Sequence, residues 1–293
     1  MKIGLGAPVA GAWASPDTLT RVAVLAEELG YDSLWTFQRL LVGVGDRLDP
    51  VYQSVMDPLL PLGFVAAHTS RIRLGVALVN LPFVSPVYLA KQAATLDVLS
   101  GGRFDLGLGT GWSDVEFAAT GASHARRGAR AEEYVRVLRT LWNDDPASFD
   151  GEFYQVPPSR MRPRPVQQGG PPILLGGVAR PALARAGRLA AGWMSRSATD
   201  LDRIAEDIAV VRGAAPDPAK VRVVVRGVVR PGPREGRLSG SWDEIRADAA
   251  WLGDQGVTEL FYDLNWHEHV GGPDEAPERA ADLAMEIIEA LAP

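Results

Sequence analysis

Two glycine-rich segments of the chain carry residue types that can bind an anion. The segment Gly176–Arg180 follows an apolar run and leads into a helical pattern. Glycines at the start of a helix expose backbone N–H groups, and together with a neighbouring arginine these can bind a phosphate. The alternative is that the glycines only form a tight turn and Arg180 is solvated. Gly109–Trp112 has the same two interpretations, and the presence of both segments favours a phosphorylated ligand.

Tryptophans near predicted strand ends indicate a second kind of site. Five of the eight tryptophans lie in strands or close to their ends: Trp13, Trp35, Trp112, Trp193 and Trp266. Most tryptophans in such places pack in the core or at a rim. If several of them converge at one mouth, they form an apolar pocket suited to a flat heteroaromatic ring.

Other common catalytic motifs find little support. The chain has no cysteine, which excludes thiolate nucleophiles and zinc thiolate sites. Among the four histidines only His267 and His269 are close in sequence, so we expect no metal site. The segment Leu106–Gly111 partly resembles a dinucleotide-binding fingerprint, but no acidic residue closes a following strand at the required spacing. A Gly-x-Ser-x-Gly motif, typical of acyl-transfer hydrolases, is absent.

The composition is that of an ordinary globular protein. The chain has 293 residues, 46% of them hydrophobic and 23% charged, enough for one large α/β barrel or two ordinary domains. The formal net charge of −6 argues against a nucleic-acid or membrane-surface partner. The amino terminus is a poor signal peptide, and no stretch approaches the ~20 apolar residues that span a bilayer. We therefore expect a cytoplasmic protein.

The elements that must position these residues alternate between strands and helices. The strands are apolar runs without strict alternation, as expected for parallel strands covered on both faces. They are predicted at Lys2–Ala7, Ser33–Phe37, Ile72–Val79, Phe104–Leu108, Pro172–Leu175, Trp193–Ser195, Val221–Val229 and Glu259–Leu264. Helices are predicted at Asp17–Leu29, Pro58–His68, Val87–Leu99, Glu116–Ala119, Ala131–Trp142, Ala182–Leu189, Leu201–Arg212, Asp243–Leu252 and Pro277–Leu291. Eight such strands predict a (β/α)₈ TIM barrel, a single domain of residues 1–293, rather than an open doubly wound sheet.

One segment interrupts this alternation. Within Asn143–Pro171, Asp150 and Gly151 lie between aromatic residues, which is a hairpin signal, and several prolines follow. We therefore predict a hairpin and a proline-rich segment inserted between the fourth helix and the fifth strand.

The active site of a parallel barrel lies at the carboxyl ends of its strands. Candidate residues are therefore those that directly follow the predicted strands. They are Trp13, Phe37, Gln38, Arg39, Asn80, Thr110, Gly111, Trp112, Gly176, Gly177, Ser195, Arg196, Arg230, Asn265, Trp266 and His267.

An ordered string of motifs in this chain resembles the bacterial luciferase-like monooxygenase superfamily. The motifs are RIRLGVALVNLPFVSPVYLAKQAATLDVLSGGRFDLGLGTGW, EFAATG, RGARAEEYVRVLRTLW, FDGEFYQVPP, RPRPVQQGGPPILLGG and RAGRLAAGWM, and the match covers most of residues 1–195. More narrowly, the chain is similar to the branch that often uses the 8-hydroxy-5-deazaflavin coenzyme F420 instead of FMN. The resemblance implies a TIM barrel that holds the cofactor at the carboxyl-end mouth.

The resemblance also implies which residues hold the cofactor. Its phosphate is expected near the loops after the fourth and fifth strands, at Thr110, Gly111, Trp112, Gly176, Gly177, Val178, Ala179 and Arg180. Family members commonly carry a bulge with a non-prolyl cis peptide in the third strand, which supports the face of the ring system. The matching bond joins Ala77 and Leu78.

Two positions depart from the pattern of the F420-dependent dehydrogenases that this chain resembles. Gln38-Arg39 stands where those enzymes tend to have Asp-His, and Trp112 stands where the sugar-phosphate dehydrogenases have a glutamate. Both changes remove proton-transfer groups that alcohol oxidation needs. Arg39 is then a candidate for binding an anionic or carbonyl group of the substrate or for stabilising charge on the reduced ring. The alternative for Arg39 is a salt bridge across the rim.

Together these features predict an oxidoreductase that transfers hydride between reduced F420 and an apolar organic substrate, such as an activated alkene or imine. Hydride transfer needs positioning, electrostatic support and exclusion of water, and we expect the positioning from Trp13, Arg39, Asn80 and Trp112. One alternative is an FMNH₂- and O₂-dependent monooxygenase, and a second is a non-catalytic flavin-binding protein. The expected partners are a small-molecule substrate, a separate flavin or F420 reductase, and a second copy in a homodimer.

Overall fold

Eight parallel strands close into a barrel. The structure, a computed structural model, describes residues 1–293. Its barrel strands are β1 (Lys2–Gly6), β2 (Ser33–Thr36), β3 (Arg73–Asn80), β4 (Phe104–Gly109), β7 (Ile173–Gly176), β8 (Gly192–Met194), β9 (Arg222–Val228) and β12 (Glu259–Asp263). They follow one another around the barrel in chain order, and β12 pairs with β1 to close it. The predicted (β/α)₈ architecture is confirmed.

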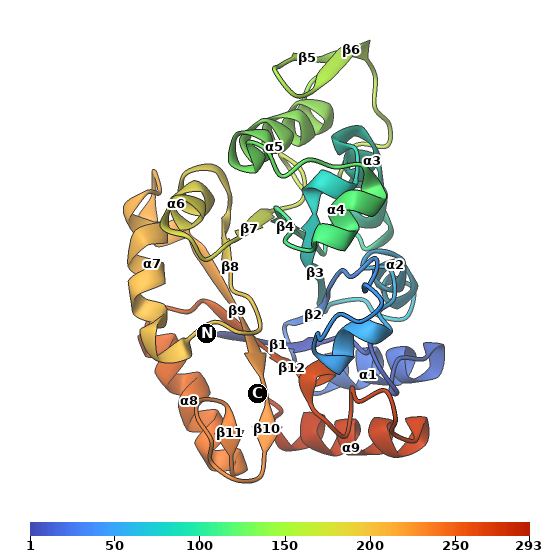
Figure 1. Ribbon diagram of the computed structural model, residues 1–293, viewed down its shortest axis with the longest axis vertical. Helices are drawn as coiled ribbons and strands as arrows, with labels where there is room; N and C mark the ends of the chain where they lie inside the picture. The colour runs from blue at the N-terminus through green and yellow to red at the C-terminus, as the bar shows by residue number, and fades with distance from the viewer.

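Helices surround this barrel (Figure 1). They are α1 (Pro16–Glu28), α2 (Leu60–Ala66), α3 (Pro86–Leu99), α4 (Asp114–Thr120), α5 (Arg127–Asn143), α6 (Arg180–Leu189), α7 (Ile204–Gly213), α8 (Trp242–Asp254) and α9 (Pro277–Ala290). Side chains fix two of the starts: Ser15 caps α1, and Ser241 forms a capping box with Glu244 at α8. None of these helices has the length and apolarity needed to cross a bilayer.

Short 3-10 helices complete the connections. They are η1 (Pro50–Gln53), η2 (Leu81–Phe83), η3 (Leu201–Arg203), η4 (Pro218–Lys220) and η5 (Leu264–Trp266). The pair β10 (Arg230–Pro231) and β11 (Ser239–Gly240) lies in the connection from β9 to α8.

The predicted hairpin is present between α5 and β7, the fifth barrel strand. Its strands β5 (Ala147–Asp150) and β6 (Gln155–Ser159) pair antiparallel. Glu133 of α5 accepts hydrogen bonds from three successive backbone N–H groups of the turn, those of residues 152–154. These bonds tie the hairpin to the helical layer, and in Figure 1 it lies beyond α5, at the periphery of the molecule.

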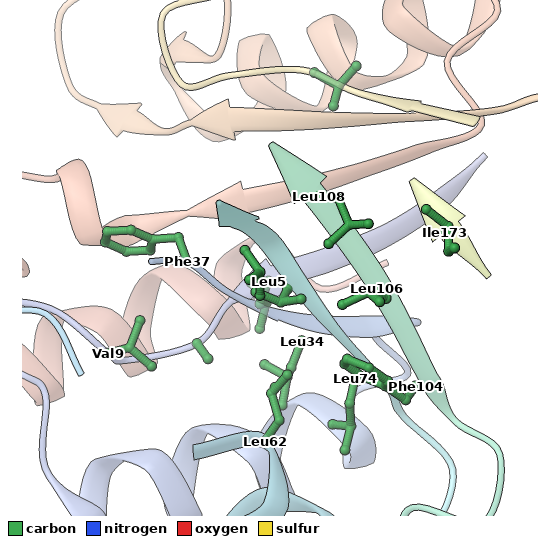
Figure 2. Packing of buried hydrophobic residues seen from close by; sticks show 14 of the residues in the cluster. Leu5, Val9, Leu34, Phe37, Leu62, Leu74, Phe104, Leu106, Leu108 and Ile173 are labelled. Carbon is green, nitrogen blue, oxygen red and sulfur yellow. The ribbon is translucent and has the colours of Figure 1, made fainter. Parts of the chain in front are cut away.

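Two hydrophobic clusters fill the structure. The larger one joins strands to helices, and Figure 2 shows Leu34 of β2 and Leu74 of β3 beside Leu62 of α2. Side chains alternate between the two faces of a strand, so Trp35 points away from Leu34 and into the barrel. The smaller cluster comes from six strands and fills the interior: Trp35, Ala77, Leu174, Met194, Val224 and Phe261.

A charged network closes the amino-terminal end of the barrel. Asp105 of β4 is completely buried and accepts paired hydrogen bonds from Arg73 of β3 and Arg222 of β9. Arg222 also donates to Glu259 of β12, 3.0 Å away. Burial alone would raise the pKa of Asp105, but the two guanidinium groups hold it below its ordinary value. The network links four strands at the end opposite the predicted site.

Candidate functional site

A β-bulge in β3 shapes the carboxyl end of the barrel. The register of β3 against β4 shifts around the Ala77–Leu78 bond, and this bond is cis, as the resemblance implied. The Leu78 side chain lies over glycine positions of the neighbouring strands. A Cβ added at Gly107 would lie 2.9 Å from Leu78 Cδ2, and one at Gly176 would collide with Leu78 Cδ1. The absence of side chains at these two glycines therefore leaves the space that Leu78 occupies.

The two glycine-rich segments lie on one rim, because they follow the paired strands β4 and β7. Gly111 and Gly177 have φ values of +73° and +149°, where glycine is favoured. Trp193 Nε1 donates a hydrogen bond to the Gly177 carbonyl oxygen, 2.9 Å away, which fixes the second segment. Val178, Ala179 and Arg180 are exposed at the start of α6. Trp112 of the first segment is exposed as well, so both segments are accessible to a ligand, and their role in binding a phosphate stays a prediction.

Arg39 takes part in a buried ion pair at the same end of the barrel. Its side chain is 4% exposed, and Nη1 lies 3.0 Å from Oε2 of Glu116, a residue of α4 that is 1% exposed. Glu116 Oε1 accepts a hydrogen bond from the Leu40 N–H at 2.6 Å. The salt bridge across the rim, the alternative for Arg39 in the sequence analysis, is therefore present. Nη1 is within ion-pair distance of Glu116, but neither Nη1 nor Nε of Arg39 makes a hydrogen bond of good geometry within the protein. Buried donors of this kind are normally bonded to a ligand or to a water molecule.

Four aromatic rings form a continuous aromatic wall beside Arg39. The wall consists of Phe37, Tyr52, Trp112 and Trp266, whose neighbouring ring centroids are 4.9–6.4 Å apart. The Arg39 guanidinium lies 4.5 Å from the Tyr52 ring and 4.4 Å from the Trp112 ring. Two of the five tryptophans considered above, Trp112 and Trp266, therefore do converge. Tyr52 was not foreseen, because η1 follows no predicted strand.

A second buried arginine lies at the other end of the aromatic wall. The Arg226 guanidinium lies 4.0 Å from the Trp266 ring and 4.6 Å from the Phe37 ring. Its Nε donates to Asp263 Oδ2 at 2.6 Å, and Asp263 is fully buried. Sequence reasoning missed both charges of this pair. The available signal was a charged residue inside the otherwise apolar strand VVVRGV.

Trp13 belongs to the hydrogen-bonded group of side chains that holds Asp263 in place. Asn265 donates from Nδ2 to Asp263 Oδ1 at 2.8 Å, and its own Oδ1 accepts from Trp13 Nε1 at 3.1 Å. Trp13 is completely buried. Its placement is that of a packing residue behind the mouth, and its role in positioning a ligand stays a prediction.

The remaining predicted rim residues have mixed placements. The Gln38 side-chain oxygen accepts a hydrogen bond from the Asn80 N–H at 2.7 Å, which joins the ends of β2 and β3. The Asn80 side chain lies over Gly109, since a Cβ there would come 3.0 Å from Asn80 Oδ1. Ser195 accepts a hydrogen bond from the Arg226 N–H at 2.9 Å. His267 is half-buried, and burial followed by the charges of His269 and Arg230 lowers its pKa.

Comparison with known proteins gives a family match over most of the chain. Residues 3–281 match the family model described as luciferase-like monooxygenase. An uncharacterised protein of Mycobacterium tuberculosis is 33% identical over 249 residues, which are 83% of this chain and 78% of that protein. An FMNH₂-dependent dimethylsulfone monooxygenase of Pseudomonas putida is 30% identical over 198 residues, 67% of this chain and 52% of that protein.

Solved structures share the barrel. The monooxygenase RslO1 from Streptomyces bottropensis superposes with a TM-score of 0.79 at 24% identity, covering 100% of this chain and 98% of that one. An F420-dependent secondary alcohol dehydrogenase, in complex with an F420–acetone adduct, superposes with a TM-score of 0.75 at 18% identity and covers 99% of both chains. These low identities establish the fold alone. The match to the family model is what decides the family: the chain belongs to the luciferase-like monooxygenases.

Proposed function

We propose that this chain is an oxidoreductase that binds a reduced flavin-type cofactor at the carboxyl end of the barrel. The observation that carries the proposal is the β3 bulge, which lays the Leu78 side chain over the glycines of β4 and β7. The absence of side chains at Gly107 and Gly176 lets Leu78 lie close to β4 and β7, and we expect the flat ring of the cofactor to pack on Leu78. The segments Thr110–Trp112 and Gly177–Arg180 lie on the rim beside it, where an anionic tail would bind.

The residues around this platform have complementary roles. When bound, reduced F420 supplies a hydride, and reduced FMN supplies electrons to oxygen. Glu116 holds Arg39 in place, and the free Arg39 donors can support negative charge on the ring or on a substrate oxygen. Asn80 stays a candidate for positioning at the end of β3. The aromatic wall offers an apolar surface that excludes water from the substrate.

The first candidate reaction is hydride transfer from F420 to an activated alkene or imine. It is supported by the state of the two buried carboxylates at the mouth, neither of which is free to act as a general base. Glu116 is engaged by Arg39 and by a backbone N–H, and Asp263 is engaged by Arg226 and Asn265. Alcohol oxidation needs a general base, whereas hydride transfer to an activated double bond relies mainly on positioning.

The second candidate is an FMNH₂-dependent monooxygenase. The observation that favours it is the sequence similarity to a relative that bears this name, at 30% identity. The same platform and aromatic wall would serve either cofactor, since both present a flat tricyclic ring and an anionic tail.

Separate titrations with F420 and FMN, followed by quenching of the cofactor's own fluorescence, test the proposal. We expect F420 to bind tightly, and reduced F420 to be consumed when activated alkenes or imines are added. Binding of FMN alone, with oxygen-dependent turnover, would select the second candidate. Binding without turnover would indicate a non-catalytic flavin-binding protein, and binding of neither cofactor would refute the proposal.

The expected cytoplasmic location, separate reductase and homodimer also stay predictions. Sedimentation velocity across a range of protein concentrations tests the homodimer directly. A reductase requirement is tested by supplying chemically reduced cofactor, which should restore turnover without a second protein.

A further inference from the structure

We propose that a cavity at the carboxyl ends of β8 and β9 binds the oxyanion head of the substrate, a carboxylate, sulfonate or phosphate, through Arg226 and Arg230. The cavity has a volume of about 250 Å³. Side chains from the segment 197–202 form one side of it, and Arg226, Val228, Arg230 and Arg237 form the other. This inference rests on the proposed function, because it defines the class of substrate for the same mouth.

Arg226 is held so that part of its guanidinium group is left for a ligand. Its side chain is 8% exposed, and the rings of Trp266 and Phe37 lie against it. Asp263 takes the Nε hydrogen bond, but neither Nη group of Arg226 donates a hydrogen bond to the protein. A nearly buried guanidinium with two free NH₂ groups beside a cavity is suited to bidentate binding of an oxyanion.

Arg226 and Arg230 carry the donors around the cavity that are available to an anionic ligand. Arg230 is exposed and forms no ion pair. Arg237 is already committed, since it pairs with Asp202 at 2.8 Å and with Asp248 at 3.0 Å. The positive charge of Arg237 compensates the negative charge of Asp202. Asp200 is then the one lining carboxylate without a cationic partner, and its side chain accepts the Asp202 N–H. Arg226 is itself paired with Asp263, so Arg230 and Asp200 are the lining charges left without an ion-pair partner, and an anion would bind through Arg230 and the free Nη groups of Arg226.

The cavity and the aromatic wall meet at Arg226. One face of its guanidinium group lies on Trp266 and Phe37, and the group also lines the cavity. A substrate with its apolar body on the wall can therefore place an anionic head in the cavity. This geometry favours an apolar acid over a plain hydrocarbon.

The cofactor is a second source of the same oxyanion chemistry. The glycine-rich segments that we assign to its tail follow β4 and β7, whereas the cavity lies at β8 and β9. Two separate anion positions on one rim are expected if cofactor and substrate each bring an anionic group. Binding of the cofactor and of a substrate-like acid must therefore be measured separately.

Benzoate and benzenesulfonate are suitable probes, with benzamide as the uncharged control, measured by calorimetry and ligand-observed NMR. We expect Arg226→Lys to weaken benzoate binding about tenfold or more, because the bidentate charge-assisted contact is lost. Arg230→Gln should weaken it by about two- to fivefold, as expected for an exposed charge. Arg279→Gln changes another exposed arginine, on α9, and is the matched control, which should bind like wild type. Affinity for benzamide should not change.

The same variants are titrated with F420 and FMN, and their affinities for the cofactor should equal that of wild type. Loss of cofactor binding with unchanged benzoate binding would assign the oxyanion to the cofactor and overturn the inference. Wild-type affinity for benzoate in Arg230→Gln would overturn it as well, and this exposed substitution does not endanger folding. If benzoate binding depends on Arg226 and Arg230 but neither cofactor binds, the proposed function fails while the subsite stands.

Discussion

At the scale of single residues, the mouth is organised by two arginines that are each paired with a carboxylate. Glu116 holds Arg39, and Asp263 holds Arg226. All four side chains are largely withdrawn from water. In such an environment the removal of one partner leaves an uncompensated charge, which costs more than the pair itself contributes. Single and paired substitutions should therefore behave differently.

The Arg39–Glu116 pair gives a direct test of this behaviour. Arg39→Met alone should lower the free energy of unfolding by about 3–5 kcal/mol, because Glu116 is left charged and buried. The double variant Arg39→Met, Glu116→Gln should recover most of that loss, since the glutamine oxygen can still accept the Leu40 N–H. Urea unfolding of the wild type, Arg39→Met, Glu116→Gln and the double variant measures the coupling. Additive losses would show that the two side chains do not interact.

Glu27 at the end of α1 predicts a pH dependence. Burial would raise its pKa, but hydrogen bonds from the backbone of Ile72, Arg71 and Ser70 outweigh burial and lower it to about 2, from 4.5. The folded state therefore gains stability from ionised Glu27 that is complete above pH 4.5 and is lost as the pH falls toward 2. Glu27→Gln should cost about 1 kcal/mol at neutral pH, a value reduced by the solvent near this carboxylate. Unfolding measured at neutral and acidic pH should show that wild type and variant converge in acid, and a constant difference would contradict the assignment.

At the scale of elements, local sequence predicts most of the fold because each element carries its own signal. Strand β9 and helix α3 follow from apolar runs that end at glycines or prolines, and the hairpin follows from Asp150-Gly151. The site is predicted less completely because its partners come from distant elements. Nothing in the sequence near Arg39 indicates that Glu116 of α4 will meet it, and Glu116 reads only as part of a helix. The cis bond at Ala77–Leu78 came from the family resemblance and not from local propensity.

Two glycine substitutions distinguish the cofactor platform from the barrel itself. In Gly176→Ala the new Cβ meets only the end of the flexible Leu78 side chain, whereas in Gly107→Ala it collides with the Val76 carbonyl oxygen. We expect Gly176→Ala to weaken cofactor binding with little loss of stability. Gly107→Ala should lower the free energy of unfolding by about 1–3 kcal/mol or more, because backbone must move.

Thermal unfolding and cofactor titration of both variants separate these effects. If the double variant Gly176→Ala, Leu78→Ala binds cofactor like wild type, the collision with Leu78 is the whole cause of the loss in Gly176→Ala. Unchanged cofactor affinity in Gly176→Ala would contradict the placement of the ring against Leu78.

At the scale of the whole molecule, the two ends of the barrel have different roles. The amino-terminal end contains the network of Asp105, Arg73, Arg222 and Glu259, in which each charge has a partner. The carboxyl end contains donors that the protein leaves free, on Arg39 and Arg226. Fully hydrogen-bonded charges fix the barrel at one end, and arginines with free N–H donors prepare the other end for a ligand.

Asp105→Asn tests this separation of roles. The substitution removes the charge that compensates Arg73 and Arg222, so we expect a loss of about 3–5 kcal/mol in the free energy of unfolding. Because the pKa of Asp105 is lowered in the folded protein, wild-type stability should be full above the ordinary carboxyl pKa and fall in acid. The cofactor affinity of the folded variant should match that of wild type. A variant that is stable but no longer binds cofactor would contradict the separation.

The exposure of Trp112 makes the mouth visible to solution spectroscopy. Trp112 is 54% exposed, and the other seven tryptophans are buried or half-buried. A neutral collisional quencher such as acrylamide should therefore reach Trp112 in preference to the other seven. Any molecule that settles on the aromatic wall will shield this indole, including colourless ones. The unlabelled protein thus carries its own occupancy sensor, which allows libraries of candidate substrates to be screened before a reaction is known.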